Sequence, residues 1–458
     1  MGKKVTVEEL LVKAKKPAKL ALAYHPFYEG KVQVMPKCAI RTPYDFAIWY
    51  TPGVAASCRK IKEEPELVFQ HTNRWNYVAV VSDGTRVLGL GDIGPEAGLP
   101  VMEGKALLFK YLGGVDAFPI CLGTKDPDEI ITACRWLEPT FGGINLEDIS
   151  KPKCFYILEH VREQLKIPVW HDDQQGTATV ILAGLINALK LVGKKMDEAL
   201  ITMIGVGSAN TRTAIVLMRA GVKPGNIMLV DTKGILHPNR KDLEAEKKEN
   251  PWKWDFCLKT NAEGRTGDMA EALKDADACI AASKPGPGTI KKEWVAQMAT
   301  NSIIFACANP IPEIWPGEAK EAGAKIVATG RSDFENQINN SLGFPGIFRG
   351  VLDVKAKTIT DEMCIAAGME LAKFADERGI HEGDIVPRMD EWEVYPREAV
   401  ACALKSMEEG VARVKPSRQE LWDRAVSIIK NARDSTKVLM EKGLIKPPPP
   451  EEEVLGSP

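Results

Sequence analysis

The 458-residue sequence lacks the features that mark membrane, secreted and disulfide-stabilised proteins. It contains no uninterrupted apolar run of about 18 residues, the length that a membrane-spanning helix needs. Its first residues, Met1-Gly2-Lys3-Lys4, are not followed by the apolar stretch of a signal peptide. Its ten cysteines form no CxxC pair and no dense framework, which favours reduced thiols. These absences predict a cytoplasmic protein with no membrane partner.

An excess of charge of one sign is also missing. The chain carries 60 basic and 62 acidic residues, and the basic ones are scattered rather than gathered with aromatics into a strip. We therefore expect no nucleic-acid partner. The remaining composition, 45% hydrophobic and 27% charged, is typical of an enzyme-sized chain with two or three domains.

Short apolar segments that alternate with helical segments predict an α/β fold. We expect an N-terminal α/β domain over residues 1–170 and a Rossmann-like, doubly wound dinucleotide-binding domain over 171–355. A helical segment over 356–442 should pack on both domains, and the Pro-rich tail, 443–458, should be disordered. The expected parallel strands of the second domain lie at 200–204, 227–230, 278–281, 303–308 and 325–328.

Two pairs of carboxylates stand at the ends of two predicted strands. Glu147-Asp148 end the first strand, Asp172-Asp173 end the second, and the segment 154–166 between them has helical spacing of its apolar residues. This order is typical of a βαβ unit, in which both strands are parallel and finish at the same sheet edge. Ligands of open α/β sheets bind at that edge. We therefore expect the four acids to converge.

Converging carboxylates favour a particular kind of metal site. Oxygen ligands suit Mg²⁺ or Mn²⁺ with positions left open for substrate oxygens, whereas zinc would require His or Cys at this spacing. A lone acid pair more often caps a helix, but two pairs on one edge favour the metal. His171 is left out of the ligand set because a lone His beside a strand end is more often structural.

A glycine turn follows the carboxylates along the chain. Gly205-Val206-Gly207 stands between a predicted strand and a predicted helix near Arg212 to Ala220, Ser208 follows the turn as a further cofactor-binding candidate, and Asp231 ends the next strand. This context predicts a pyrophosphate on the helix N-terminus and an acid on a ribose hydroxyl. An ordinary strand-to-helix turn remains the alternative, because Asn210 occupies the position of the third small residue.

The choice of dinucleotide stays open in the sequence. Asp231 favours NAD⁺ slightly, because a carboxylate accepts hydrogen bonds from the ribose diol and repels a 2′-phosphate. Lys233 weakens this preference, since a cation two residues later can neutralise that phosphate.

Five motifs in order resemble the short, prokaryotic-type malic enzymes over residues 20 to 410. They are Trp49-Tyr-Thr-Pro-Gly-Val54, Val87-Leu-Gly-Leu-Gly-Asp-Ile-Gly94, Glu103-Gly-Lys105, Phe141-Gly-Gly-Ile-Asn-Leu-Glu-Asp-Ile149 and His171-Asp-Asp-Gln-Gln-Gly-Thr-Ala178. The resemblance implies oxidative decarboxylation of (S)-malate to pyruvate and CO₂, with NAD⁺ or NADP⁺ and Mn²⁺ or Mg²⁺. Gln175 and Asn210 depart from the family pattern.

The same resemblance implies catalytic roles. It makes Glu147, Asp148 and Asp173 the metal ligands and places Asp172 in the adjoining shell. Lys105 matches the general base that takes the C2 hydroxyl proton, and Tyr50 matches the proton donor to the enolate carbon. We place Lys105 near the start of a predicted helix, where positive helix potential, burial and a nearby metal would lower its pKa.

The resemblance also implies substrate and cofactor contacts. Arg86 is a candidate clamp for a malate carboxylate, although short members often have a small residue there. Asn309 and Asn340 match asparagines that contact substrate and nicotinamide, and the motif Phe344-Pro-Gly-Ile-Phe-Arg-Gly350 follows in the family position. Loop-capping is the alternative role for both asparagines.

Two other functions remain open at this stage. One is a malolactic-type enzyme that converts malate to lactate with retained NAD, which the residues hardly distinguish from a malic enzyme. The other is a catalytically silent nucleotide-binding protein, which the joint presence of Tyr50, Lys105 and three metal ligands disfavours. The resemblance further implies a homo-oligomer, with a dimer expected.

Overall fold

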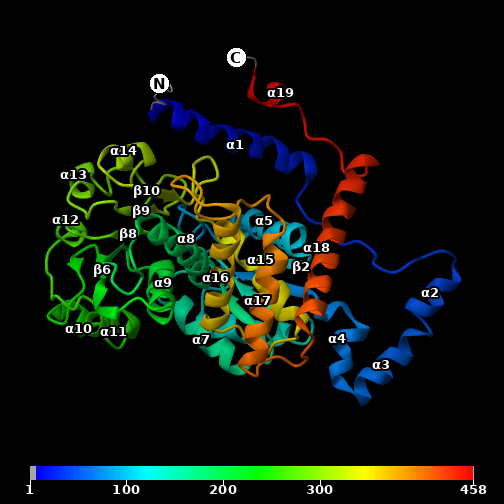
Figure 1. Ribbon diagram of the computed structural model, residues 1–458. Helices are drawn as coiled ribbons and strands as arrows, with labels where there is room; N and C mark the ends of the chain where they lie inside the picture. The colour runs from blue at the N-terminus through cyan, green and yellow to red at the C-terminus, as the bar shows by residue number, and fades with distance from the viewer. Residues whose placement is uncertain (1–6, 457–458) are drawn as a thin grey trace.

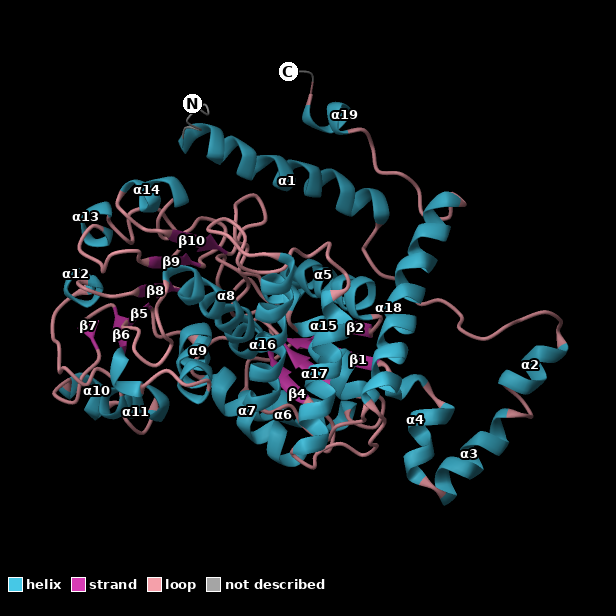
Figure 2. Cartoon of the chain, in the orientation of Figure 1, coloured by secondary structure: helices cyan, strands magenta, loops and turns pink. Residues whose placement is uncertain are grey.

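Two parallel β-sheets, each with its own helices, organise the chain. The computed structural model describes residues 7–456, with side chains from residue 16 on. Figures 1 and 2 show the two sheets side by side, with the C-terminal helices across the first sheet and the N-terminal helices outside the body. The α/β class with a doubly wound second sheet is confirmed.

The first sheet has the strand order β2-β1-β3-β4, and every pair is parallel. Its strands are β1 (Tyr77–Ser82), β2 (Asp116–Cys121), β3 (Gly143–Leu146) and β4 (Val169–His171). The side chains alternate between two cores, as a pleated strand requires. Ala79 and Val81 face the core built with α6 (Pro127–Leu137) and α7 (Lys153–Gln164).

The opposite face of this sheet packs on α5 (Pro95–Gly113) and on a later helix, α15 (Phe344–Asp353). Val78 and Val80 share a core with Phe109 of α5 and with Phe344 and Phe348 of α15. Helix α15 packs between α5 and the C-terminal helices, and all ten of its residues are therefore buried. Thus α15 lies against the first sheet, although its sequence position is within the range 171–355 predicted for the dinucleotide domain.

The second sheet has the order β10-β9-β8-β5-β6-β7, parallel except for the antiparallel edge strand β7. The expected strands are present as β5 (Ile201–Ile204), β6 (Ile227–Asp231), β8 (Ala278–Ala281), β9 (Ile303–Ala306) and β10 (Ile326–Thr329), and β7 spans Gly234–Ile235. One face packs on α8 (Thr177–Val192) and α9 (Ser208–Arg219). The other packs on α12 (Met269–Leu273), α13 (Lys292–Val295) and α14 (Pro316–Glu321). Two further helices, α10 (Lys241–Ala245) and α11 (Pro251–Lys259), follow β7.

The stretch Asp172–Val192, which ends with α8, is long and apolar enough to cross a membrane by length and composition. However, 72% of its apolar window is buried inside the protein. Helices α9 and α16 pack against α8, which is the environment of a core helix.

Three long helices close the body. They are α16 (Asp361–Arg378), α17 (Val394–Glu408) and α18 (Arg418–Glu441), in the region where the sequence predicted helices. Their buried side chains enter the cores of both sheets: Leu371 and Tyr395 join the second, and Met363 and Leu421 join the first.

The predicted disorder of the Pro-rich tail is wrong for its described part, which ends at residue 456. The tail lies alongside α1 (Val7–Tyr28) and ends in the short helix α19 (Glu451–Leu455), as Figure 1 shows. The hydroxyl of Tyr24 donates to the carbonyl of Pro449 at 3.1 Å, and that of Tyr28 donates to Lys446 at 2.7 Å. Consecutive prolines restrict the chain and leave their carbonyls free to accept, so ordering this segment costs little entropy.

The remaining N-terminal helices lie apart from both sheets. They are α2 (Tyr44–Trp49), α3 (Val54–Glu63) and α4 (Val68–His71), and Figure 1 shows α2 and α3 extending away from the body. No residue of α3 is buried. Tyr50, at the end of α2, is 73% exposed, and its neighbour Trp49 is 51% exposed.

Candidate active site

The ends of β3 and β4 bring three carboxylates together. Leu146 of β3 is paired with His171 of β4, so Glu147 and Asp172 leave the sheet side by side. Oxygen atoms of Glu147, Asp148 and Asp173 all lie within 4.8 Å of one another. The predicted convergence of the two acid pairs at one sheet edge is confirmed.

Glu147 and Asp148 are buried, Asp173 is partly buried, and the three acids crowd one another. Burial, followed by the charge of Asp173, raises the pKa of Asp148 to about 8. Burial also raises the pKa of Glu147 and of Asp173 above their usual values. The Oδ2 atom of Asp148 is buried without a hydrogen-bond partner among the described residues. Crowded, buried oxygens of this kind fit a divalent cation, which would remove the penalty of burying their charges.

The backbone at Asp148 is held in an uncommon conformation. Its φ is 55°, in the left-handed region that non-glycine residues seldom adopt. Its N–H donates to Oδ2 of Asp173 at 2.9 Å, and its carbonyl accepts the N–H of Arg86 at 2.9 Å. These contacts hold Asp148 in a backbone conformation that typically costs about 1–3 kcal/mol. Such conformations are common at functional sites.

Glu147 is oriented from within the sheet. The amide nitrogen of Asn145 in β3 donates to Oε2 of Glu147 at 2.8 Å, and the amide oxygen of Asn145 accepts the indole N–H of Trp170 in β4 at 2.6 Å. The strand register, which pairs Asn145 with Trp170, makes this chain of contacts possible. The other oxygen of Glu147 is thereby left to face Lys105.

Lys105 lies at the centre of the acids. Its Nζ is 2.5 Å from Oδ2 of Asp172, 3.0 Å from Oε1 of Glu147 and 4.4 Å from the ring centroid of Phe344. The pKa of Lys105 does not fall as the sequence predicted. Burial disfavours the ammonium, but the Asp172 and Glu147 carboxylates outweigh burial and raise the pKa. The residue also lies in the middle of α5 and not near its start.

Asp172 links Lys105 to the second half of the chain. The amide nitrogen of Asn340 donates to the same oxygen of Asp172 that faces Lys105. A Cβ added at Gly176 would overlap the other Asp172 oxygen, so a glycine is required there. Burial raises the pKa of Asp172, although Lys105 opposes the rise. Lys105, Asp172 and Asn340 therefore form one connected group.

The π-helical turn Asp172–Gly176 explains one departure from the family pattern. Gln175 accepts the backbone N–H of His171 through Oε1 at 3.0 Å and is itself buried. The ring of His171 is fully buried, and burial lowers its pKa to about 3. Its Nδ1 is 3.6 Å from Asp173, too far for a hydrogen bond. Gln175 thus closes the turn that positions Asp172 and Asp173, and His171 stays neutral.

Arg86 and Asn309 lie at the rim of the site. The guanidinium of Arg86 donates to the carbonyl of Leu88 at 2.6 Å, and its charge opposes the rise in the pKa of Asp173. Asn309 packs against two glycines: a Cβ added at Gly89 would lie 2.5 Å from its carbonyl oxygen, and one at Gly330 would lie 2.6 Å from its amide nitrogen. The loop of the first domain that carries Arg86 therefore touches the loop after β9 in the second.

Tyr50 is not brought to Lys105 within one chain. Helix α2, which ends just before Tyr50, is separated from α5 by the outward course of the N-terminal segment (Figure 1). The sequence carries no signal for this separation, because the direction of a segment without buried contacts is not encoded in local periodicity.

The glycine turn has the geometry expected for a dinucleotide site. Gly205 has a φ of 92°, and a Cβ there would lie 2.7 Å from the carbonyl of Ala282. Gly207 precedes Ser208, the first residue of α9. A Cβ added at Gly207 would lie in open space. Asn210, where a small residue was expected, is buried and donates to the carbonyls of Ile204 and Gly205 at 2.9 Å. It secures the turn to β5.

Asp231 stands at the end of β6 as predicted, but its carboxylate is not free. It accepts from Arg240 and Lys253 and from the backbone of Lys233. The slight preference for NAD⁺ assumed a carboxylate available to the ribose. Arg240 and Lys253 were missed because they follow Asp231 by 9 and 22 residues without any local pattern.

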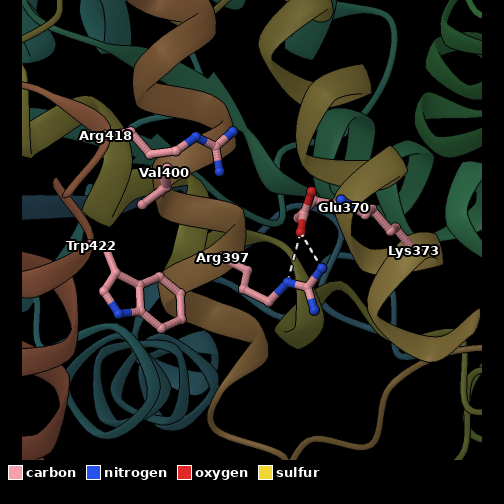
Figure 3. Close-up of a pocket in the computed structure, with 6 residues that line it drawn as sticks. All are labelled: Glu370, Lys373, Arg397, Val400, Arg418 and Trp422. Atoms are coloured by element: carbon pink, nitrogen blue, oxygen red, sulfur yellow. Dashed lines mark hydrogen bonds and ion pairs between the residues drawn. The ribbon is translucent and has the colours of Figure 1, made fainter. Parts of the chain in front are cut away.

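A pocket of about 290 Å³ lies elsewhere, among the C-terminal helices. Figure 3 shows Glu370, Lys373, Arg397, Val400, Arg418 and Trp422 around it. Arg397 and Glu370 pair at 2.7 Å across its wall, so part of its charge is already satisfied. None of the candidate catalytic residues lines this pocket.

Comparison with known proteins identifies the family. Residues 29–127 and 123–162 match the malic enzyme N-terminal domain, and residues 174–407 match the malic enzyme NAD binding domain. The chain belongs to the malic enzyme family. As a family member, it is an oxidoreductase with a nicotinamide-nucleotide domain.

Relatives resemble this malic enzyme over most of its length. The bifunctional malic/malolactic enzyme of Bacillus subtilis is 46% identical over 88% of this chain and 96% of its own length. The NAD-dependent malic enzyme of Geobacillus stearothermophilus is 47% identical over 84% of this chain and 78% of its own length. The NADP-dependent malic enzyme of Haemophilus influenzae is 41% identical over 89% of this chain and 54% of its own. The crystal structure of Entamoeba histolytica malic enzyme is 47% identical, covers 99% of this chain and 95% of its own, and has a TM-score of 0.96.

Proposed function

We propose that this chain catalyses the oxidative decarboxylation of (S)-malate to pyruvate and CO₂, with reduction of NAD⁺ or NADP⁺. One observation carries the proposal: Lys105 and three metal-suited carboxylates meet at one sheet edge, and Asn340 connects this group to the half of the chain that holds the dinucleotide fold. A redox reaction at one substrate carbon needs both parts within reach of each other.

Glu147, Asp148 and Asp173 would hold Mn²⁺ or Mg²⁺. Their all-oxygen donor set, the burial of Glu147 and Asp148, and the Oδ2 of Asp148, which has no hydrogen-bond partner among the described residues, support this assignment. The cation would supply positive charge next to the C2 oxygen and C1 carboxylate of malate, where negative charge develops in the reaction.

Lys105 is proposed to take the C2 hydroxyl proton as the C2 hydrogen leaves as hydride. An ammonium cannot accept a proton, so Nζ must first release one. The carboxylate of Asp172 lies 2.5 Å away and is placed to receive that proton. We therefore assign Asp172 the role of proton partner to Lys105, with Asn340 holding its reacting oxygen in place.

Tyr50 is proposed to donate a proton to the enolate carbon in the active site of a second copy of the chain. Two observations support a homodimer of this kind: Tyr50 is 73% exposed on a segment outside the body, and α2 presents the apolar side chains of Tyr44, Phe46 and Trp49 to solvent. Exposed apolar side chains clustered on one segment mark an interaction surface.

We propose substrate and cofactor contacts for the other predicted residues. Arg86, at the rim beside Asp173, would bind a malate carboxylate, and Asn309 and Asn340 would face substrate and nicotinamide. The pyrophosphate would lie at the start of α9, where the backbone N–H groups of Gly207 and Ser208 are available and the positive φ of Gly205 shapes the turn before them. All ten cysteines are free, in support of a reducing cytoplasmic location.

An assay with (S)-malate, Mn²⁺ and either NAD⁺ or NADP⁺ tests the proposal. We expect the absorbance of the reduced nicotinamide to increase with time. We expect no increase when EDTA removes the cation. Asp173→Asn should weaken activation by Mn²⁺ by about 10–100-fold, because one ligand charge and the acceptor for the Asp148 N–H are altered. Asp390→Asn, an exposed control, should match the wild type. Absence of reduction with both nucleotides would refute the proposal.

A malolactic outcome is the second candidate, because the Bacillus subtilis relative is named as bifunctional. The same acid, base and cation would serve, and the product would differ only if pyruvate were reduced before release. Lactate without free reduced nucleotide identifies that outcome.

A further inference from the structure

Four basic side chains gather where the second sheet meets the glycine turn. They are Lys151, Lys233, Arg240 and Lys253, here called the basic cluster. Gly205 donates its N–H to Val230 at 2.9 Å, so the turn after β5 lies against the end of β6, one residue before Asp231. Lys151 extends the cluster to the turn, because its Nζ donates to the carbonyl of Val206 at 2.7 Å. In a fold of this type the adenosine ribose binds at this place.

Protein donors already occupy both oxygens of Asp231. Oδ1 accepts from the Lys233 N–H at 2.9 Å and from Nη1 of Arg240 at 3.2 Å. Oδ2 accepts from Nη2 of Arg240 at 3.1 Å and from Nζ of Lys253 at 2.5 Å. A carboxylate offers about four acceptor positions. A ribose diol would therefore have to displace one of these donors before it could bind Asp231.

The charge at this position is positive. Arg240 pairs with both Asp231 and Asp242, and Lys233 pairs with Asp242 at 3.2 Å. The four cations of the basic cluster exceed these two carboxylates, so an anion would be attracted here. Lys233 is 64% exposed, and Lys151 is exposed as well, which leaves both able to contact a ligand. Burial and the charge of Lys253 lower the pKa of Lys151, in keeping with cations that lack a full set of counterions.

We propose that the basic cluster binds the 2′-phosphate of NADP⁺, so that this malic enzyme prefers NADP⁺ to NAD⁺. In this arrangement Asp231 does not bind the ribose hydroxyls. It holds Arg240 and Lys253 in place for the phosphate. The inference rests on the proposed nucleotide-dependent function and specifies its cofactor.

Binding of two small probes tests the inference without malate, metal or turnover. By calorimetry, 2′,5′-ADP should bind the full-length protein at least about tenfold more tightly than 5′-AMP, which lacks only the 2′-phosphate. The double variant Lys151→Ala/Lys233→Ala should lose most of this ratio through weaker binding of 2′,5′-ADP alone. Lys259→Ala on α11, whose Nζ pairs with Asp255 away from Asp231, is the matched control and should keep the ratio.

The variant Arg240→Ala is a second test, and it should change the binding of the two probes differently. It frees acceptor positions on Asp231 for the ribose, so the affinity for 2′,5′-ADP should fall while that for 5′-AMP holds or rises. Equal binding of the two probes to the wild type, or an equal loss for both probes in the double variant, would overturn the inference. Malate oxidation that is as efficient with NAD⁺ as with NADP⁺ would overturn it while leaving the proposed function intact. A preserved probe preference in a protein that does not oxidise malate would support it and refute the proposed function.

Discussion

Replacing Lys105 by alanine is expected to lower kcat for malate oxidation by about 10²–10⁴-fold, the usual contribution of a general base. The expectation follows from the position of Nζ between Asp172 and Glu147, where no other described basic side chain makes an ion pair with these two acids. The measurement is the steady-state rate with saturating malate, Mn²⁺ and nucleotide. Lys110→Ala on the same helix is the control, because Lys110 pairs with Asp116 at the surface and should be dispensable.

A structural explanation for such a loss can be separated from a catalytic one. The alanine leaves space where the amine was, so added methylammonium should restore part of the rate if Lys105 acts as a base. Binding of 2′,5′-ADP should be unchanged, because Lys105 is not part of the basic cluster, whose members contact Asp231, Asp242 and the turn at Val206. A rate within about tenfold of the wild type would contradict the role of Lys105.

Combining two inactive variants should restore activity if Tyr50 acts in the site of a second copy. Tyr50→Phe removes the proton donor and Lys105→Ala removes the base. In a mixed dimer, one site then has its own Lys105 and the Tyr50 of the other chain. With random pairing of equal amounts, half of the dimers are mixed and each has one intact site, so about one quarter of wild-type activity should return. Co-expression of the two chains with different affinity tags provides the mixed dimers.

The reverse combination is the control. When the double variant Tyr50→Phe/Lys105→Ala pairs with the wild type, mixed dimers have no intact site, and about one quarter of the activity remains. If both residues of a site came from one chain, the two single variants would restore nothing, and the control mixture would retain about one half. That pattern would contradict the shared site.

The first sheet and its carboxylate edge were predictable because their signals are local. The apolar segments and the helix between the acid pairs define a βαβ unit, and parallel strands leave few choices for where Glu147 and Asp173 end. The same reasoning found the turn at Gly205. Each of these predictions depends on residues within one strand-helix unit.

Features set by tertiary contacts were not predictable in the same way. The pKa of Lys105 rises because two carboxylates from other segments surround it, and the expectation of a fall treated burial as the larger effect. Asp231 loses its availability to donors that follow it by up to 22 residues. The tail is ordered because Tyr24 and Tyr28, more than 400 residues away, donate to its carbonyls. Local composition carries no record of such partners.

The products formed from (S)-malate test the central claim most directly. The enzyme is incubated with malate, Mn²⁺ and NADP⁺ or NAD⁺, and pyruvate, lactate and reduced nucleotide are measured in the same sample. Hydride transfer followed by loss of CO₂ and proton donation predicts pyruvate and reduced nucleotide in equal amounts, with no lactate. Lactate without reduced nucleotide, or no consumption of malate with either nucleotide, would contradict the account.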